Sequence, residues 1–217
     1  MRWACLGAIL GMLCGCAVQP IGPVGAEQAA RAAKANTDIA AYHLQRGDYA
    51  EALEKVERAL EQSPDLTAAH VIAAELNARI DRPEIASRHY QRALQLEPDN
   101  GAALNNYAAF LCRDSQIERA LDLWTLAASN RLYEGRAMAL SNAGRCLANA
   151  GHWAAARSYW QRALDARPGY APAIDGLAEA ARALKQGGAA TQGFSRYTEA
   201  FGESRSQLAD RVDRDEY

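Results

Sequence analysis

Cysteine is the residue type in this chain with the most chemistry to offer, and its five copies fall into two groups. Cys5, Cys14 and Cys16 lie close to the start of the chain, whereas Cys112 and Cys146 lie far downstream. A cysteine can be alkylated, bind a metal, act as a nucleophile or form a disulfide, and its surroundings decide which of these occurs. The surroundings of the two groups differ, so we expect different chemistry from each.

The first group lies in a secretory signal. The short basic start Met1-Arg2 precedes a mostly apolar run from Trp3 to Leu13, which is too short to be a permanent membrane-spanning helix. The stretch Leu13-Cys14-Gly15-Cys16 resembles a bacterial lipobox. That resemblance implies thioether lipidation of Cys16, cleavage before it and N-acylation of the new terminus, whereas an ordinary cleaved signal peptide with incidental cysteines is the alternative. The next residue is Ala17 rather than aspartate, which resembles the pattern of outer-membrane sorting in Gram-negative lipoproteins.

This start predicts a domain tied to a membrane by a lipid. Residues 1–15 are the expected signal peptide, and residues 16–26 are the lipidated N-terminus and a tether. The tether is expected to be extended because Val18 to Ala26 contains two prolines and two glycines. The folded domain is expected over residues 27–202, with a polar tail over residues 203–217.

A period of 34 residues runs through the folded domain. Small residues and prolines recur with this spacing, as in Ala52, Ala86 and Ala120, in Ala59, Ala93 and Ala127, and in Pro64 and Pro98. After a two-residue insertion near Leu132 to Gly135, the register resumes at Ala156, Ala163 and Pro168. A larger residue lies between the two alanines of each period, namely Val56, Tyr90, Trp124 and Trp160. Alanine lets two helices approach closely, the larger residue fills the adjoining hole, and proline ends the helix. The combination resembles the tetratricopeptide repeat, and a generic alanine-rich helical bundle is the alternative.

The expected fold is therefore all-α, a superhelical solenoid of antiparallel helix pairs with a concave surface. Four full repeats are expected and a partial fifth, in which Ala190, Phe194 and Tyr197 have matching offsets. The predicted helix pairs are 33–46 with 49–62, 67–80 with 84–96, 101–113 with 117–130, 136–150 with 153–166, and 171–185 with 189–201.

The two downstream cysteines lie in first helices of consecutive repeats. Cys112 is the twelfth and Cys146 the tenth residue of its helix by the repeat register. First helices of neighbouring repeats run side by side and parallel, so the two cysteines can lie at similar height in an oxidising compartment. The spacing supports a disulfide between them, and two buried thiols are the alternative.

Residues 104–112 and 141–146 carry a more specific resemblance. The third repeat contains Leu104-Asn105-Asn106-Tyr107 followed by Phe110-Leu111-Cys112, and the fourth contains Asn142, Gly144 and Cys146. Together with the lipobox and the tandem repeats, these stretches resemble the PilF/PilW family of type IV pilus biogenesis and stability lipoproteins. The resemblance implies a protein on the inner leaflet of the outer membrane that helps the pilus secretin to localise or assemble and that stabilises pili. Some members of that family carry six repeats, more than are visible here.

Asparagine is unfavourable inside helices, so Asn105, Asn106 and Asn142 in first helices need an explanation. Asn106 and Asn142 occupy the same sixth place of their repeats. An amide there can grip a peptide backbone from the concave surface, or it can satisfy groups within the scaffold. Arg113 and Arg145 can add charge to the same groove, and solvated helix faces are the alternative. These five residues are the candidate partner-binding residues.

Other kinds of chemistry leave no pattern in the sequence. His43, His70, His89 and His152 show no metal-ligand spacing with one another or with cysteine. We find no nucleophile motif, phosphate loop or dinucleotide turn. The net charge is −2 and no basic stripe is present, which argues against a nucleic-acid-binding protein. We therefore expect no enzyme activity, cofactor, metal or small-molecule substrate.

The sequence leads to one preferred function and two alternatives. The preferred function is a lipid-anchored adaptor of the outer membrane, facing the periplasm, that binds the pilus secretin or another type IV pilus assembly protein. A lipoprotein of another outer-membrane assembly system, such as the tight-adherence pilus or barrel insertion, belongs to the same binding class. A regulatory adaptor of a cell-wall enzyme belongs to a different class.

Overall fold

A computed structural model describes the backbone of residues 23–201 and the side chains of residues 25–186. The predicted signal peptide, the lipidation candidate Cys16 and the predicted tail over 203–217 lie outside the described residues. Within the described part the chain is entirely helical between short turns, as predicted for an all-α protein. No helix in that part is long and apolar enough to cross a membrane.

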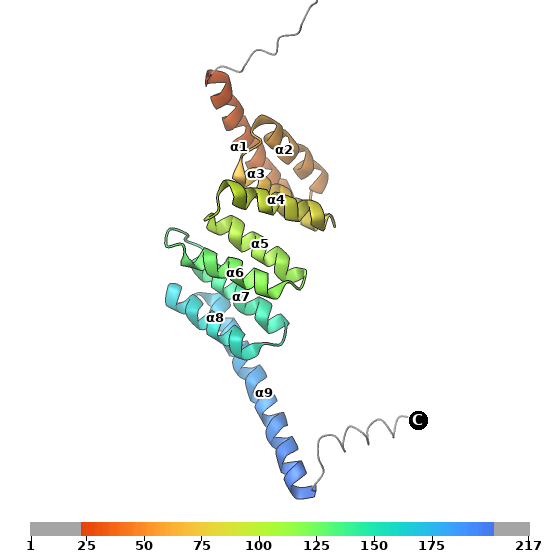
Figure 1. Cartoon of the computed structure of the whole chain (residues 1–217), viewed down its shortest axis with the longest axis vertical. Helices are drawn as coiled ribbons and strands as arrows, with labels where there is room; N and C mark the ends of the chain where they lie inside the picture. Colours follow the sequence, from red (N-terminus) through yellow and green to blue (C-terminus); the bar gives the residue numbers. More distant parts are fainter. Residues whose placement is uncertain (1–22, 202–217) are drawn as a thin grey trace, which may run out of the picture.

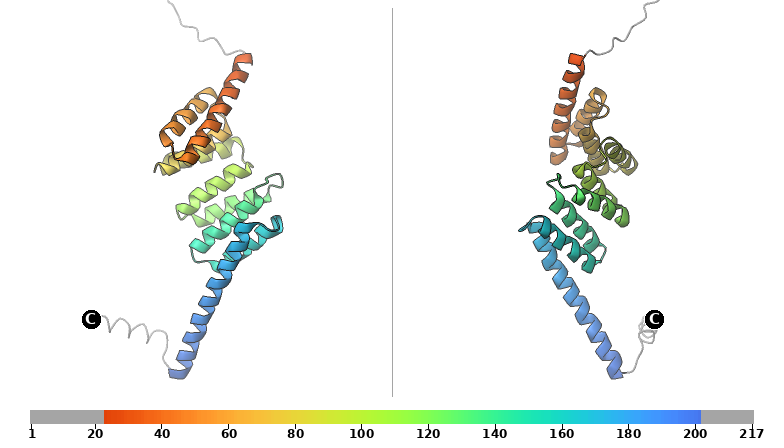
Figure 2. Two further views of the ribbon diagram at one scale, coloured as in Figure 1. Left: turned by 180° about the vertical axis from the view of Figure 1, so that it is seen from behind. Right: turned by 60° about the vertical axis from the view of Figure 1, so that its left-hand side comes forward.

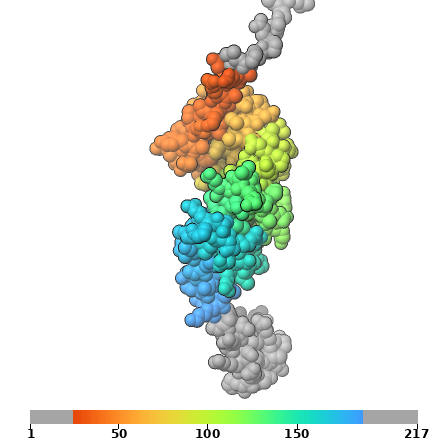
Figure 3. All heavy atoms as spheres, turned by 90° about the vertical axis from the view of Figure 1, so that its left-hand side faces the viewer, coloured from red at the N-terminus to blue at the C-terminus, as the bar shows by residue number. Residues whose placement is uncertain are grey.

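The described helices follow one another in antiparallel pairs along an elongated body (Figures 1 and 3). Their bounds are α1 Pro23–Arg46, α2 Tyr49–Gln62, α3 Thr67–Arg79, α4 Pro83–Leu96, α5 Gly101–Arg113, α6 Ile117–Ser129, α7 Arg136–Asn149, α8 Trp153–Ala166 and α9 Ala171–Phe201. The ends of the helices from α2 to α8 differ from the sequence prediction by at most one residue. The 34-residue register is therefore the register of the fold.

Two layers of helices result from this stacking. We call α1, α3, α5, α7 and α9 the A helices, and α2, α4, α6 and α8 the B helices. Each A helix from α1 to α7 packs most extensively on the B helix that follows it, and each A helix also contacts the next A helix. The A helices thus form a continuous row, and we call its surface on the side away from the B helices the A face. This face corresponds to the concave surface expected from the sequence.

The repeated small and large residues make the close contacts between helices. Ala120 and Ala127 are fully buried, and Trp124 between them is 1% exposed. Trp160 occupies the same place one repeat later and is also fully buried. Its indole leaves no room for a larger neighbour, because a Cβ atom on Gly144 would lie 2.8 Å from Trp160 Nε1. The large residue of a B helix therefore determines which small residue the facing A helix can carry.

The turn between the A and B helices of each repeat contains one residue with positive φ. Gly47 and Gly151 take this conformation in the first and fourth repeats, at φ of 82° and 80°. Asp81 and Ser115 take it in the second and third repeats, at φ of 57° and 58°. The two glycine turns follow from the residue type, because glycine adopts positive φ without steric cost. The other two turns follow from the repeat geometry rather than from the residue type.

The first and last helices differ from the helices predicted from the sequence. Helix α1 begins at Pro23, so residues 23–26 of the expected tether are helical, as are residues 27–32 before the predicted first helix. Proline suits the first turn of a helix because no partner is needed there for an N–H group. At the other end, α9 is continuous over Ala171–Phe201, and the separate second helix predicted over 189–201 is wrong. Gly187 and Gly188 cost helix stability but, unlike proline, keep the N–H donor and do not clash.

Candidate functional site

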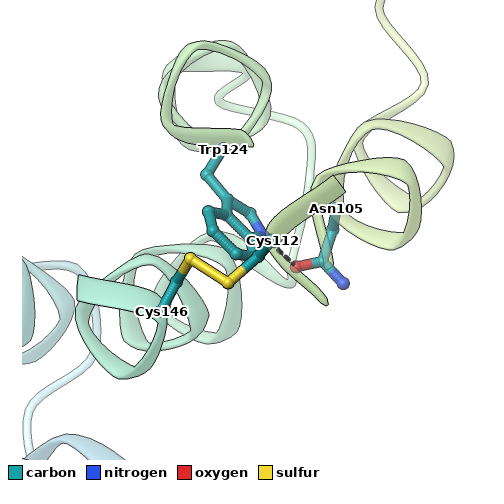
Figure 4. Close-up of a disulfide and its surroundings, with 4 residues drawn as sticks. All are labelled: Asn105, Cys112, Trp124 and Cys146. Atoms are coloured by element: carbon teal, nitrogen blue, oxygen red, sulfur yellow. Dashed lines mark hydrogen bonds between the residues drawn. A yellow bond between two sulfur atoms is a disulfide. The ribbon is translucent and has the colours of Figure 1, made fainter. Parts of the chain in front are cut away.

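The α5–α7 junction is held together by a disulfide. Cys112 of α5 and Cys146 of α7 are bonded, with their Cα atoms 6.1 Å apart (Figure 4). The two helices belong to consecutive repeats, and the bond spans 34 residues of sequence. It therefore links the third repeat to the fourth covalently, as the sequence predicted.

Next to the disulfide lies a network of amide and indole groups. Asn105 of α5 is 4% exposed. Its Oδ1 accepts a hydrogen bond from Trp124 Nε1 at 3.1 Å (Figure 4). The same oxygen accepts from Asn142 Nδ2 at 3.0 Å. Its Nδ2 donates to Asn106 Oδ1 at 3.2 Å. The predicted partner-binding role of Asn105 is thus corrected: the side chain is buried and its amide is used within the scaffold.

Asn106 and Asn142 each use only part of their amide within the protein. Both side chains are half-buried, on neighbouring A helices. Asn106 accepts through Oδ1, which leaves its Nδ2 donors, and Asn142 donates through Nδ2, which leaves its Oδ1 acceptor. Within the described residues no further hydrogen bond of either amide is present. The pair therefore retains both donor and acceptor capacity beside the α5–α7 junction.

Two surface pockets occur between A helices at equivalent places of the repeat. The α5–α7 notch has a volume of about 210 Å³ and is lined by Ala109, Cys112, Arg113, Trp124, Asn142, Arg145, Cys146 and Asn149. The α1–α3 notch has a volume of about 270 Å³ and is lined by Ala41, Leu44, Gln45, Ile72, Glu75 and Arg79. When the repeats are aligned, each of the six residues of the α1–α3 notch has an equivalent residue in the α5–α7 notch.

The two predicted arginines have different surroundings in the α5–α7 notch. Arg145 forms an ion pair with Glu179 of α9, and its guanidinium lies 5.5 Å from the ring centre of Trp160. Arg113 is exposed, and it forms no ion pair with any residue of the described region. A guanidinium in this position can bind carboxylates or backbone carbonyls of a partner. Exposed ion pairs such as Arg145–Glu179 contribute little stability, so a partner can compete for Arg145 as well.

A histidine pair that the sequence did not indicate lies between α3 and α4. His70 is 8% exposed, and its Nδ1 lies 2.9 Å from Nδ1 of His89. Its Nε2 lies 2.9 Å from the Pro64 carbonyl oxygen and donates to it, so its Nδ1 accepts from His89. Burial lowers the pKa of His89 below its ordinary 6.5, and the neighbouring His70 and Arg88 lower it further. No group of three or more potential metal ligands occurs within the described part of the chain.

Comparison with known families supports the repeat assignment. The family model described as tetratricopeptide repeat matches residues 89–122. The type IV pilus assembly protein PilF of Pseudomonas aeruginosa is 31% identical over 102 residues, which cover 47% of this chain and 40% of that protein. Cellulose synthase operon protein C of Xanthomonas axonopodis is 33% identical over 102 residues, which cover 46% of this chain and 7% of that protein. The chain thus spans less than half the length of these two curated relatives.

Solved structures extend the likeness to most of the chain. The crystal structure of PilW, a type IV pilus biogenesis factor, is 27% identical with a TM-score of 0.65, and the match covers 80% of this chain and 79% of that one. Pseudomonas aeruginosa PilF shares the fold at 21% identity, with a TM-score of 0.61 and coverage of 87% and 99%. YrrB, a tetratricopeptide-repeat protein with an unusual peptide-binding site, shares it at 22% identity, with a TM-score of 0.54 and coverage of 66% and 73%. The chain is therefore a tetratricopeptide-repeat protein related to the PilF and PilW type IV pilus biogenesis proteins.

Proposed function

We propose that this protein is a lipid-anchored, periplasm-facing adaptor of the outer membrane that binds a type IV pilus assembly protein through its A face. It would assist localisation or assembly of the secretin and stabilise pili without catalysing a reaction. The relation to PilW over most of the chain supports a role in pilus biogenesis. The peptide-binding site of YrrB is a precedent for recognition on this fold.

The observation that carries the proposal is the half-satisfied amide pair Asn106 and Asn142 beside the α5–α7 notch. A backbone segment of a partner presents both N–H and C=O groups, and this pair offers an acceptor and donors for them. The disulfide and Asn105 hold the two helices in one arrangement, so little ordering is needed when a partner binds. Arg113 adds a charge that can select acidic partner segments.

The binding part of the proposal is tested by changing both asparagines to alanine. Asn106→Ala together with Asn142→Ala should leave the fold intact, because Asn105 keeps its bond to Trp124 and alanine is the better helix former. Capture of pilus assembly proteins from crosslinked membranes and twitching motility should both fall, since each lost amide contact is worth about 0.5–1.5 kcal/mol. Gln161→Ala, which removes an exposed amide from the B helix α8, is the matched control.

Different results separate the competing interpretations. A lower melting temperature with motility reduced only in proportion would assign the two asparagines to the scaffold. Normal motility and normal secretin multimers in the double variant would contradict binding at this notch. Crosslinking to another outer-membrane assembly system, or to a cell-wall enzyme, would replace the pilus role with one of the alternative adaptor functions.

The anchoring part of the proposal rests on the lipobox-like stretch that ends at Cys16. Cys16→Ser should give an unlipidated protein that no longer floats with outer membranes in a density gradient. Cys14→Ser serves as the matched control, because it changes the neighbouring cysteine and leaves the proposed acceptor in place. Unchanged membrane retention of the Cys16→Ser protein would contradict lipid anchoring at this residue.

A further inference from the structure

Within the described residues, α9 is an A helix that no B helix follows. It follows the fourth repeat as α3, α5 and α7 follow the repeats before them, and it packs on α7 and α8. From there it continues as a single helix that projects beyond the rest of the described chain (Figures 1 and 2). Within the described region no helix lies on the side of α9 that corresponds to the α5–α6 and α7–α8 contacts.

The missing contact leaves residues exposed whose equivalents are buried in the other repeats. Ile174 is 48% exposed, whereas the equivalent Leu104 and Leu140 are 1% and 4% exposed. Ala178 and Ala181 are exposed as well. Their equivalents in α5 are Ala108 and Leu111, which are 0% and 1% exposed. These residues, with the flanking Leu177 and Leu184, form the unpaired face of α9.

Two opposite charges border this face. Asp175 and Arg182 are seven residues apart, so they lie on the same flank of the helix. Both are exposed, and neither takes part in an ion pair with another residue of the described region. Asp175 precedes Ala178 in the sequence, and Arg182 follows it.

We propose that the unpaired face of α9 binds the same face of a second copy of this chain, with the two helices antiparallel. A two-fold axis near Ala178 brings Ile174 of each copy against Ala181 of the other. The same axis brings Asp175 of each copy to Arg182 of the other, which forms two interchain ion pairs. A parallel pairing would place like charges at the same height, so the charge order selects the antiparallel arrangement.

The second copy accounts for the face better than a helix of unrelated sequence. In such a two-fold symmetric dimer the same surface of both copies forms the interface. The unpaired face of α9 therefore provides the apolar residues and the charges on both sides of the contact. Small residues at Ala178 and Ala181 permit the close approach that the A and B helices show elsewhere in this chain. Each copy then provides the helix that does not follow α9 within the described part of the other. This inference is independent of the partner proposed for the A face.

The test is the oligomeric state of the full chain and of charge-reversed variants, measured by light scattering over a range of protein concentrations. The unchanged protein should be a dimer at high concentration. Asp175→Arg and Arg182→Asp should each raise the dimer dissociation constant about tenfold or more, because each creates two like-charge contacts. Arg157→Asp, an exposed reversal on α8, is the matched control and should leave dimerisation unchanged.

Mixing the two single variants decides which molecule covers the face. The Asp175→Arg chain carries two bases and the Arg182→Asp chain carries two acids. The mixture should therefore form heterodimers at concentrations at which each variant alone dimerises only weakly. A monomer at all concentrations would overturn the proposal and leave the face to a later segment of the same chain or to another protein. A dimer that is insensitive to both reversals, or a mixture that stays monomeric, would equally overturn it.

Discussion

The α1–α3 and α5–α7 notches occupy equivalent places of the repeat but differ in chemistry. The α1–α3 notch has an apolar centre of Ala41, Leu44 and Ile72, and its acid and base, Glu75 and Arg79, pair with each other within α3. The α5–α7 notch has a disulfide, two amide side chains and the arginines 113 and 145. The first notch therefore satisfies its charges internally, whereas the second is cross-linked and retains polar groups for a partner. The scaffold alone does not require this difference, because both notches support the same helix packing.

The largest predicted effect comes from breaking the covalent link at the α5–α7 junction. Reduction of Cys112–Cys146 should lower the free energy of unfolding by about 3–4 kcal/mol, because a closed loop of this size restricts the unfolded chain. Urea unfolding with and without reductant measures the change. Hydrogen exchange should accelerate in α5 and α7 more than in α1 and α3.

A variant without the disulfide provides the control for reduction. Cys112→Ser with Cys146→Ser should unfold at one urea midpoint whether or not reductant is present. Equal stability of the oxidised and reduced native protein would show that the disulfide does not distinguish the two junctions.

A smaller effect is expected from Asn105→Ala. This change leaves the buried Trp124 indole N–H without its acceptor, which should cost about 1–3 kcal/mol in urea unfolding. Ser141→Ala at the equivalent place of α7 should cost about 0.5 kcal/mol or less, because Trp160 Nε1 donates to the main-chain carbonyl of Ser141, which the substitution keeps. Similar losses in both variants would contradict a specific role for the Asn105 side chain.

The smallest effect concerns pH and lies away from both notches, at His89. Its pKa is lowered in the folded protein by burial, by His70 and by Arg88, so the unfolded chain takes up a proton at higher pH than the folded one. Above pH 6.5, the ordinary pKa of histidine, His89 is neutral in both states and the folded protein keeps its full stability. The free energy of unfolding should decrease as the pH falls through that value, because the unfolded chain then binds the proton more readily. Urea unfolding at about pH 7.5 and about pH 5.5 measures this dependence.

Two histidine variants isolate the source of this pH dependence. His89→Gln should weaken it, because glutamine can still donate to His70 but does not titrate. His152→Gln, at an exposed position before α8, should leave it unchanged. A pH dependence that survives His89→Gln undiminished would assign it to other groups.

The sequence predicts this fold well where one spacing repeats, and less well where a residue acts alone. Ala120, Trp124 and Ala127 recur with their equivalents, so their burial could be inferred from the period. The long helix α9 could not be inferred, because Gly187-Gly188 is typical of a turn but does not force one. Helix propensity alone does not distinguish a broken helix from a continuous one at such a pair.

The candidate site likewise contains features that follow from the repeat and features that depend on single residues. The period brings Cys112 and Cys146 to similar height, which made their disulfide predictable. The role of Asn105 depends on the position of one indole N–H from another helix, and no sequence pattern encodes that geometry. The His70–His89 contact likewise joins single residues of two helices and has no counterpart in the other repeats as far as the structure describes them. Contacts that occur only once must be seen in the structure.

Photocrosslinking in cells is the sharpest test of partner binding at the α5–α7 notch. A photoreactive amino acid at Asn149, which lines this notch and forms no hydrogen bond with another side chain of the described region, reports on a bound partner without disturbing the Asn105 network. We expect a crosslink to a type IV pilus assembly protein from this position and none from Arg157 on α8. A crosslink to such a protein only from Arg157 would contradict it and move the binding surface to the B helices.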